Sequence, residues 1–536
     1  MREWQLDADV VHRRRWLSLV VLCISLIVVI IDNSILNVAL PTLGKPVARG
    51  GLGAADSDLQ WIVDSYVLVF AGLLITFGAL GDRFGRYRAL AIGLLVFGTG
   101  SILASMADNA DQLIAYRALM GIGAAAIMPA TLSIITNVFR DPRERGRAIG
   151  VWAGISGIGL AIGPVTGGFL LEHFWWGSVL LVNVPVVIIG LVGGYFLVPD
   201  SRDPAAPKVD VPGALLSIAG LTTVLWALIE GPTKGWRSAP VLGAFGLGFL
   251  IIAAFLAWER HTDHPMLDLD FFRRRRFSVA SGAITFTFMA LMGMIFGLTQ
   301  YQQSVLDYTP LRAGANLIPM SMVMMVLAPL SARWVERLGT RIVLGTGLLV
   351  VSFSMVLFSL FTVDTAAWQL ILATMVMAVG MAHIMAPATE SIMGSLPREK
   401  AGVGSAVNDT TRQMGGAIGV ALLGSLLATS YGDHVDKGLA GSGLSSRAID
   451  TIGTTIQKGI DVGAHTDGPL GGQIIDVVRE SYVTGLHLAV LVAAGILAVA
   501  AAGVFAWLPA RAATPASDTE PAPEPAADDL EPAFAD

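Results

Sequence analysis

Residues 150–168 read GVWAGISGIGLAIGPVTGG and lie in the fifth of a series of long apolar stretches. The string holds six residues at fixed offsets: Gly150, Gly159, Gly163, Pro164, Gly167 and Gly168. Three of its glycines recur every four residues, so they share one helical face that a neighbouring helix can approach closely. The proline removes one hydrogen bond of the helix and predicts a bend. This string predicts a tightly packed helix inside a membrane bundle.

The composition predicts an integral membrane protein. Hydrophobic residues make up 54% of the 536 residues and charged residues only 14%, about half the charged share of a soluble domain. The formal charge of −6 arises from a Pro/Ala-rich tail over 511–536, which we predict to be a disordered cytosolic segment. Its acids are Asp518, Glu520, Glu524, Asp528, Asp529, Glu531 and Asp536. Without them the chain carries one net positive charge, so no nucleic-acid partner is expected.

Apolar runs of about 20 residues, the length that crosses a bilayer, occur fourteen times. They lie near 17–40, 58–80, 89–107, 112–138, 148–170, 179–198, 211–230, 240–258, 278–302, 313–335, 341–361, 368–393, 403–428 and 483–508. The first run is too long for a cleaved signal peptide and is expected to be retained. It contains the only cysteine, Cys23, so no intramolecular disulfide is expected.

Basic residues orient these spans. Clusters of arginine occupy alternate connections: Arg83, Arg86 and Arg88; Arg140, Arg143, Arg145 and Arg147; Arg273 to Arg276; and Arg333, Arg337 and Arg341. Because cytosolic loops carry the excess of basic residues, both termini are predicted to be cytosolic. The long polar connection over 429–482 then faces outward, as a hairpin or an amphipathic helix.

Two pairs of segments indicate an internal repeat. Asp82–Arg86 (DRFGR) is similar to Glu336–Arg341 (ERLGTR), and Pro129–Ser133 (PATLS) is similar to Pro387–Ser391 (PATES). We therefore predict two six-helix bundles, over 1–200 and 278–510, with two inserted helices and a linker over 201–277. Repeats of this kind place a site between the halves, near the middle of the bilayer.

The loop after the second span reads GALGDRFGRYR over 78–88. Its acid and arginines can pair across helix ends and latch one conformation, or they can serve as a plain cytosolic anchor. The loop resembles the signature G-x-L-a-D-r-x-G-r-k of the major facilitator superfamily, with Tyr87 in place of a basic residue. The expected cytosolic gate comprises Gly78, Asp82, Arg83, Gly85 and Arg86, with Glu336 and Arg337 in the second half.

Further motifs narrow the resemblance to the drug:proton antiporters with fourteen helices. The glycine string resembles their antiporter motif, and Asp32–Pro41 (DNSILNVALP) resembles their signature in the first helix. Arg117 with Gly121 and Gly123 resembles the fourth-helix signature, and Arg412–Gly419 (RQMGGAIG) resembles that of helix 13. A departure follows the fifth helix, where Gly177 and Ser178 precede Asn183 and Pro185.

Four charged residues are candidates for proton coupling: Asp32, Arg117, Asp64 and Glu390. A carboxylate such as Asp32 inside an apolar helix costs several kcal/mol unless it is paired, hydrated or protonated. Arg117 stays charged and is expected to face the interior, where it tunes an acid or forms a structural pair. Asp64 is either a cavity acid or a rim residue, and Glu390 either a coupling or an interfacial residue.

Fourteen of the nineteen methionines fall between residues 289 and 414. Met289, Met292, Met320, Met324, Met381 and Met385, with Phe296 and Arg412, are candidates for a substrate cavity. Methionine is flexible and polarisable, so such a cavity adapts to varied apolar ligands, although each residue also suits ordinary packing.

No G-x4-G-K-[ST] phosphate loop occurs in the chain, so an ion gradient rather than ATP is the expected energy source. We expect no metal, no cofactor and no enzymatic activity, and a monomer suffices. A proton crossing 100 mV releases roughly 2.3 kcal/mol and one pH unit adds about 1.4, enough for a substrate gradient of roughly 500-fold.

The resulting hypothesis is a proton-coupled multidrug efflux antiporter of a bacterial plasma membrane, exporting hydrophobic, cationic or amphiphilic compounds. The alternatives are an exporter of an endogenous lipid, siderophore or secondary metabolite, and a membrane sensor or scaffold that transports nothing. In the antiporter hypothesis, Gly159, Gly163 and Gly167 face the opposite half and seal the path against proton leak.

Overall fold

The computed structural model describes residues 8–44, 46, 51–54, 56–203, 210–262 and 265–509. All secondary structure in these ranges is helical. Thirteen helices are long and apolar enough to cross a membrane, and α5 (Pro142–His173) is a further helix of 32 residues. The predicted all-α membrane fold is confirmed. The tail over 511–536 and the side chain of Pro164 lie outside the described residues, so both predictions about them stay untested.

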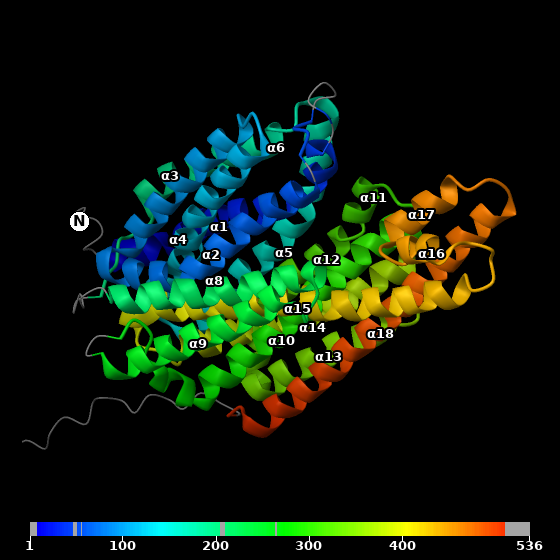
Figure 1. The fold of residues 1–536 in the computed structure, drawn as a ribbon. Helices are drawn as coiled ribbons and strands as arrows, with labels where there is room; N and C mark the ends of the chain where they lie inside the picture. The colour runs from blue at the N-terminus through cyan, green and yellow to red at the C-terminus, as the bar shows by residue number, and fades with distance from the viewer. Residues whose placement is uncertain are drawn as a thin grey trace, which may run out of the picture.

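The N-terminal helices lie side by side in the blue to cyan part of Figure 1. They are α1 (Ala8–Leu43), α2 (Asp56–Phe84), α3 (Arg86–Ser105), α4 (Ala110–Val138), α5, α6 (Ser178–Leu181) and α7 (Asn183–Leu197). Within this group α4 packs against α2 and α3, and α1 packs against α5 and α7. The short α6 and α7 together make one predicted span.

The C-terminal helices form the second group. They are α10 (Arg275–Gln300), α11 (Pro310–Ala315), α12 (Ile318–Leu338), α13 (Thr340–Phe358), α14 (Ala367–Met393), α15 (Ala401–Gly438), α16 (Ser446–Ile452), α17 (Ile456–Ala464) and α18 (Pro469–Trp507). The two groups meet where α5 packs on α12 and α14, and where α15 packs on α2 and α4.

The inserted helices are α8 (Val211–Lys234) and α9 (Ala239–His261). Helix α8 contacts α2 of the first group and α15 of the second. Leu225 packs with Leu68 and Ala71 of α2, beside Met414 and Ala417 of α15. The insert therefore covers one seam between the groups. The domain boundaries predicted at residues 200 and 277 stay predictions.

The two repeated loops have the same backbone form. Helix α2 passes into α3 through Gly85, and α12 passes into α13 through Gly339. Their φ angles are 118° and 84°, in a region that favours glycine because a Cβ atom is strained there. One glycine in each half thus lets two long helices follow one another without a longer loop.

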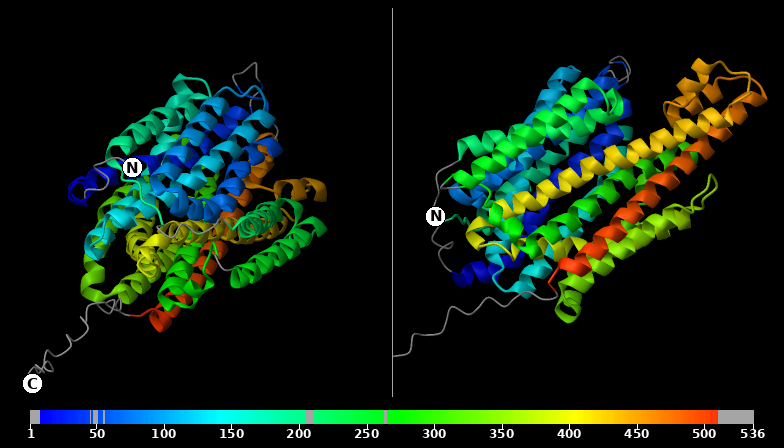
Figure 2. Two further views of the ribbon diagram at one scale, coloured as in Figure 1. Left: turned by 90° about the vertical axis from the view of Figure 1, so that its left-hand side faces the viewer. Right: turned by 60° about the horizontal axis from the view of Figure 1, so that its bottom comes forward.

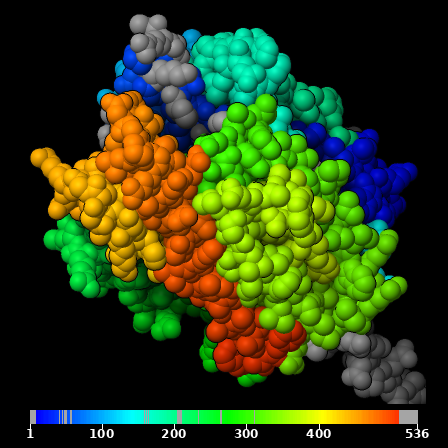
Figure 3. Space-filling model, turned by 90° about the vertical axis from the view of Figure 1, so that its right-hand side faces the viewer, coloured from blue at the N-terminus to red at the C-terminus, as the bar shows by residue number. Residues whose placement is uncertain are grey.

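The connection predicted over 429–482 is mostly helical, and its position on the outer side of the membrane stays a prediction. Helix α15 continues to Gly438 and α18 begins at Pro469, and α16 and α17 lie between them. Helix α15 ends shortly before Gly441 and Gly443, which have positive φ angles. Figure 2 shows α15 and α18 extending past the other helices, and Figure 3 looks onto this end of the molecule.

The expectation that Gly159, Gly163 and Gly167 face the opposite half is wrong. All three lie against α1 of their own half. A Cβ atom on Gly159 would lie 2.7 Å from the Ile30 side chain, and one on Gly167 would lie 2.8 Å from the Ile35 side chain. A Cβ atom on Gly163 would overlap the Ser34 side chain, whose hydroxyl donates to the Gly159 carbonyl over 3.2 Å.

The cytosolic half of α5 makes the contact with the opposite group instead. A Cβ atom on Gly150 would lie 2.6 Å from Pro329 Cα of α12, and one on Gly157 would lie 3.1 Å from Met324 Cβ. The Ser321 hydroxyl of α12 donates to the Gly157 carbonyl over 2.7 Å. The glycines of α5 therefore serve two neighbours, because the helix crosses α12 near one end and α1 near the other.

This packing predicts unequal effects of two alanine substitutions. Gly163→Ala should lower the free energy of unfolding by about 1–3 kcal/mol through overpacking against Ser34. Gly168→Ala is the matched control, because its Cβ atom would meet only Leu311, at 3.8 Å. Both changes raise helix propensity by about 1 kcal/mol, so their difference isolates the clash. Thermal unfolding in detergent measures it, and equal stabilities would contradict the α1–α5 contact.

Candidate functional site

Asp32 and Arg117 form an ion pair inside the N-terminal group. Arg117 Nη1 lies 2.5 Å from Asp32 Oδ2, and both residues are 0% exposed. Asp32 lies about 17 Å from the outer end of α1, at 1.5 Å per helical residue. Because a lone charge in the bilayer costs several kcal/mol, each of these side chains depends on the other.

The second carboxylate oxygen of Asp32 is also bonded. Asn183 Nδ2 donates to Asp32 Oδ1 over 3.0 Å, and the same amide lies 3.2 Å from the Ser101 hydroxyl. That hydroxyl donates to the Leu180 carbonyl over 2.6 Å. Asn183 was not among the predicted site residues, although the sequence placed it in a stretch that departs from the family pattern.

Helix α2 completes the surroundings of Arg117. Arg117 Nε donates to the Ile62 carbonyl over 3.2 Å, and the guanidinium lies 4.2 Å from the centre of the Tyr66 ring. Helices α1, α2 and α4 therefore meet at one guanidinium. A change in the charge of Asp32 would alter the balance of forces on all three.

The other two predicted coupling acids lie elsewhere. Asp64, half-buried on α2, lies beside Gln60 and near Glu230 of the inserted helix α8. Glu390 pairs with Arg145 of α5, with Nη2 2.7 Å from Oε1 and Nε 3.0 Å from Oε2. That pair joins α14 to α5 at the cytosolic side, so Glu390 is an interfacial residue in this structure.

Asp82 binds the first turn of α15 in the opposite group. Its Oδ1 accepts from the Gly402 amide over 2.8 Å, and its Oδ2 accepts from the Val403 amide over 3.1 Å. Arg86 donates to the same Oδ1 over 2.7 Å and to the carbonyls of Arg398 and Glu399 over 2.9 Å. The first amides of a helix lack partners within it and favour an anion. We call this set of contacts the cytosolic junction.

The remaining predicted gate residues surround this junction. A Cβ atom on Gly78 would lie 2.6 Å from the Gly402 carbonyl, so only glycine permits this approach of α2 to α15. Arg83 lies over the Phe84 ring at 5.2 Å. Glu336 lies 3.8 Å from Arg143 with much of both side chains exposed, and Arg337 is exposed. The second-half loop thus makes a weaker contact than the first.

Arg88, which follows Tyr87, pairs with Asp200 over 3.2 Å. The Tyr87 amide donates to the same carboxylate over 3.2 Å. Burial raises the pKa of Asp200 above its ordinary value, against the opposing effect of Arg88. This pair ties the start of α3 to the segment that follows α7.

The structure reveals a second buried acid that sequence reasoning missed. Asp409 of α15 is 0% exposed and lies 3.9 Å from Arg412, which is 4% exposed. The signal was present as an acid and an arginine three residues apart inside one predicted span. Arg412 itself lies over the rings of Trp152 (4.8 Å) and Phe288 (5.5 Å).

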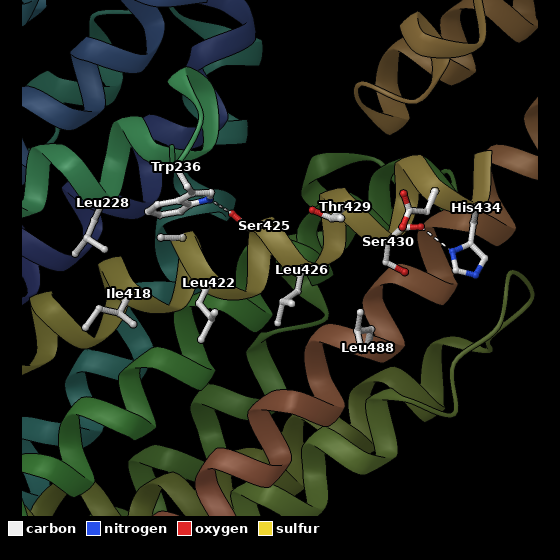
Figure 4. A pocket seen from close by; sticks show the side chains of 12 residues that line it. Leu228, Trp236, Ile418, Leu422, Ser425, Leu426, Thr429, Ser430, His434 and Leu488 are labelled. Atoms are coloured by element: carbon white, nitrogen blue, oxygen red, sulfur yellow. Dashed lines mark hydrogen bonds between the residues drawn. The ribbon is translucent and has the colours of Figure 1, made fainter. Parts of the chain in front are cut away.

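The methionines of the predicted substrate cavity are mostly buried, and their role as a cavity lining stays a prediction. Five of its methionines are less than 5% exposed: Met289, Met320, Met324, Met381 and Met385. Met292 is half-buried, whereas Phe296 is 40% exposed. The described groove of about 740 Å³ lies elsewhere, between α8, α15 and α18, and none of these residues lines it. Figure 4 shows Trp236 at one end of it, donating to the Ser425 hydroxyl over 2.8 Å.

The structure is a bundle of long membrane helices, with charged pairs in its interior and a polar junction between two groups. These features are typical of a membrane transporter. The chain belongs to the Major Facilitator Superfamily, whose model matches residues 22–420. It is 34% identical to the multidrug efflux pump LfrA of Mycolicibacterium smegmatis, over 92% of this chain and 96% of that protein. It is 32% identical to the methyl viologen resistance protein SmvA of Salmonella typhimurium, over 92% and 98%.

A solved structure shows the same fold. The human organic anion transporter MFSD10 (TETRAN) superimposes with a TM-score of 0.61 at 13% identity, over 92% of this chain and 99% of that one. At this identity the likeness concerns the helical arrangement alone. The chain is therefore a multi-pass membrane transporter of the superfamily that its loop and glycine motifs resemble.

The buried pair predicts a non-additive effect on stability. Arg117→Met leaves Asp32 charged and unpaired, at a cost of about 3–5 kcal/mol. Adding Asp32→Asn should recover much of that loss, because the double variant carries no lone charge. Thermal unfolding of the single and double variants in detergent measures the recovery. Additive losses would contradict the pairing.

Proposed function

We propose that this transporter exports hydrophobic, cationic or amphiphilic compounds across the bacterial plasma membrane in exchange for protons. The observation that carries the proposal is the Asp32–Arg117 pair, a titratable acid with 0% exposure on a membrane helix. Such an acid marks a proton or substrate pathway by default, because its burial is costly.

Proton binding at Asp32 changes the contacts of three helices. Protonation neutralises the carboxylate and removes its attraction for Arg117. The guanidinium then keeps the Ile62 carbonyl and the Tyr66 ring, both on α2, and a weak contact with the Met120 sulfur of its own helix. Loss of the proton restores the bond to α1. The charge of one carboxyl group thus biases how α1 and α2 lie against α4.

The change in helix packing that follows proton binding at Asp32 would act on the cytosolic junction. Asp82 and Arg86 hold the start of α15, while Arg145 holds Glu390. These bonds all join the two groups at one end of the bundle, so they close that end as long as they last. An exporter must break them to load substrate and reform them to release it on the far side.

The compounds are inferred from the relatives and from the energetics. LfrA is named for multidrug efflux and SmvA for resistance to methyl viologen. A proton driven by 100 mV and one pH unit releases roughly 3.7 kcal/mol, which is enough for steep accumulation of a substrate outside the cell.

Asp32→Asn should abolish proton-driven transport of a fluorescent lipophilic cation into everted vesicles. Asparagine keeps the shape of the side chain but binds no proton, so substrate binding to the purified protein should persist. Asp461→Asn is the matched control, because Asp461 is largely exposed on α17. Undiminished proton-driven transport by the Asp32 variant would overturn the proposed coupling site.

Asp82→Asn should open the cytosolic junction more often. Hydrogen bonds to a charged group contribute about 1.5–3 kcal/mol, so loss of one raises the open fraction at least about tenfold. The readout is the labelling rate of Ala401→Cys, a position 1% exposed beside the junction, by an impermeant maleimide in everted vesicles. Cys23→Ser provides the background.

Asp270→Asn is the matched control for the junction, because Asp270 lies outside it and its side chain is 74% exposed. It should leave the labelling rate unchanged. A labelling rate in the Asp82 variant equal to that of the control would show that Asp82 does not hold the junction closed.

A further inference from the structure

The pair on α15 is looser than the pair on α1. Arg412 Nη1 lies 3.9 Å from Asp409 Oδ1, whereas the Asp32–Arg117 distance is 2.5 Å. Arg412 Nη2 instead donates to the Thr389 hydroxyl of α14 over 3.1 Å. Asn408 Nδ2 approaches Asp409 Oδ1 at 3.4 Å. Asp409 is thus fully buried without a close cationic partner.

Several buried polar atoms of α15, and one of the neighbouring helix α14, make no hydrogen bond within the described part of the chain. They are Asp409 Oδ2, Arg412 Nε and the hydroxyls of Ser391, Ser405 and Thr410. Buried polar atoms in native proteins are nearly always bonded, so a group of unbonded ones calls for an explanation. A carboxylate oxygen that accepts no hydrogen bond is available to bind a proton, which forms a covalent O–H bond with it.

The two acids lie at different depths. Asp409 is eight residues from the first residue of α15, about 12 Å from its cytosolic end, whereas Asp32 is about 17 Å from the outer end of α1. They also belong to different helix groups. The inner acid lies directly behind the cytosolic junction, whose bonds reach Gly402 and Val403 of the same helix.

Arg412 is the charged side chain that acts on Asp409. Among the charged groups on the helices that pack against α15, Asp82 of α2 pairs with Arg86, Arg117 of α4 with Asp32, Glu230 of α8 with Lys234, Glu390 of α14 with Arg145, and Arg479 of α18 with Asp307. Asp64 of α2 lies beside Gln60, and Arg276 of α10 lies near Glu390 and Arg145. His487 of α18 bonds to the Phe361 carbonyl. In the described part of the chain, Arg412 is therefore the one cationic side chain within 4 Å of Asp409.

We propose that Asp409 is a second proton-binding site, which exchanges protons with the cytosol when the junction opens. The inference rests on the proposed antiport function and adds a site to it. A proton from water forms an O–H bond on the carboxylate, and the attraction for Arg412 is lost. Arg412 then keeps Thr389, the ring of Phe288 on α10 and the closer ring of Trp152, which belongs to α5 of the opposite group.

This placement links the proton to the movement of the two groups. Arg412 contacts α14 through Thr389 and α5 through Trp152, whose indole nitrogen lies 3.2 Å from the Thr131 hydroxyl of α4. Charge on Asp409 draws the guanidinium toward α15, and protonation releases it toward α5. The state of Asp409 therefore sets a contact across the seam, as the state of Asp32 sets one within the N-terminal group.

The test counts protons released when the purified full-length protein binds tetraphenylphosphonium in weakly buffered detergent solution, over a range of pH. Asp409→Asn should release about half as many protons as the wild type, since each carboxyl group holds one proton. Asp32→Asn should lose the other half, and the double variant should release none. Asp409→Glu should restore release, and Asp461→Asn, which changes an exposed acid of α17, should leave it unchanged.

The outcomes separate the two proposals. A wild-type count in Asp409→Asn, or complete loss of release in Asp32→Asn alone, would overturn the second site while leaving antiport intact. Absence of proton release and of proton-driven transport in the wild type would overturn both. Retained binding of the cation and an unchanged melting temperature in Asp409→Asn establish that the variant is folded.

Discussion

The lipid interior offers no water to solvate a charge, and the rest of this structure depends on that constraint. Three buried acids have an arginine within 4 Å: Asp32 has Arg117, Asp82 at the cytosolic junction has Arg86, and Asp409 has the more distant Arg412. Each pair also reaches beyond its own helix, through Ile62, Gly402 or Thr389. Because charges must be paired in a medium of low dielectric constant, these pairs hold separate helices in contact.

These contacts convert a proton into a mechanical signal. Removing one charge from a pair leaves its arginine with weaker partners on another helix, so the equilibrium between packings shifts. The glycines of α5 allow the packings to be close, because Gly163 lies against Ser34 and Gly150 against Pro329. Close packing makes the alternatives discrete, since side chains cannot adjust gradually at such contacts. Tight packing thus keeps the alternative helix arrangements distinct, and the charge state of the pairs shifts the equilibrium between them.

Much of the fold and part of the candidate site could be predicted from the sequence. Fourteen apolar runs and the alternation of arginine clusters define the spans and their orientation, and the motifs indicate the family. Asp32 and Arg117 stand out because each is a lone charge in a long apolar run. Asp409 was missed although Arg412 was noted, because its segment is rich in small polar residues and hides an acid. Asn183 was noted only as a departure from a family pattern.

The sequence alone determined which segments cross the membrane and which residues share a helical face, because both follow from local hydropathy and from the period of the helix. Only the tertiary structure decided which helix each face meets. The stripe of Gly159, Gly163 and Gly167 is visible in the sequence, yet nothing local says that it lies against α1 rather than α12. The partner of Asp32 is 85 residues away, and spacing along the chain carries no information about a contact made by the packing of separate helices.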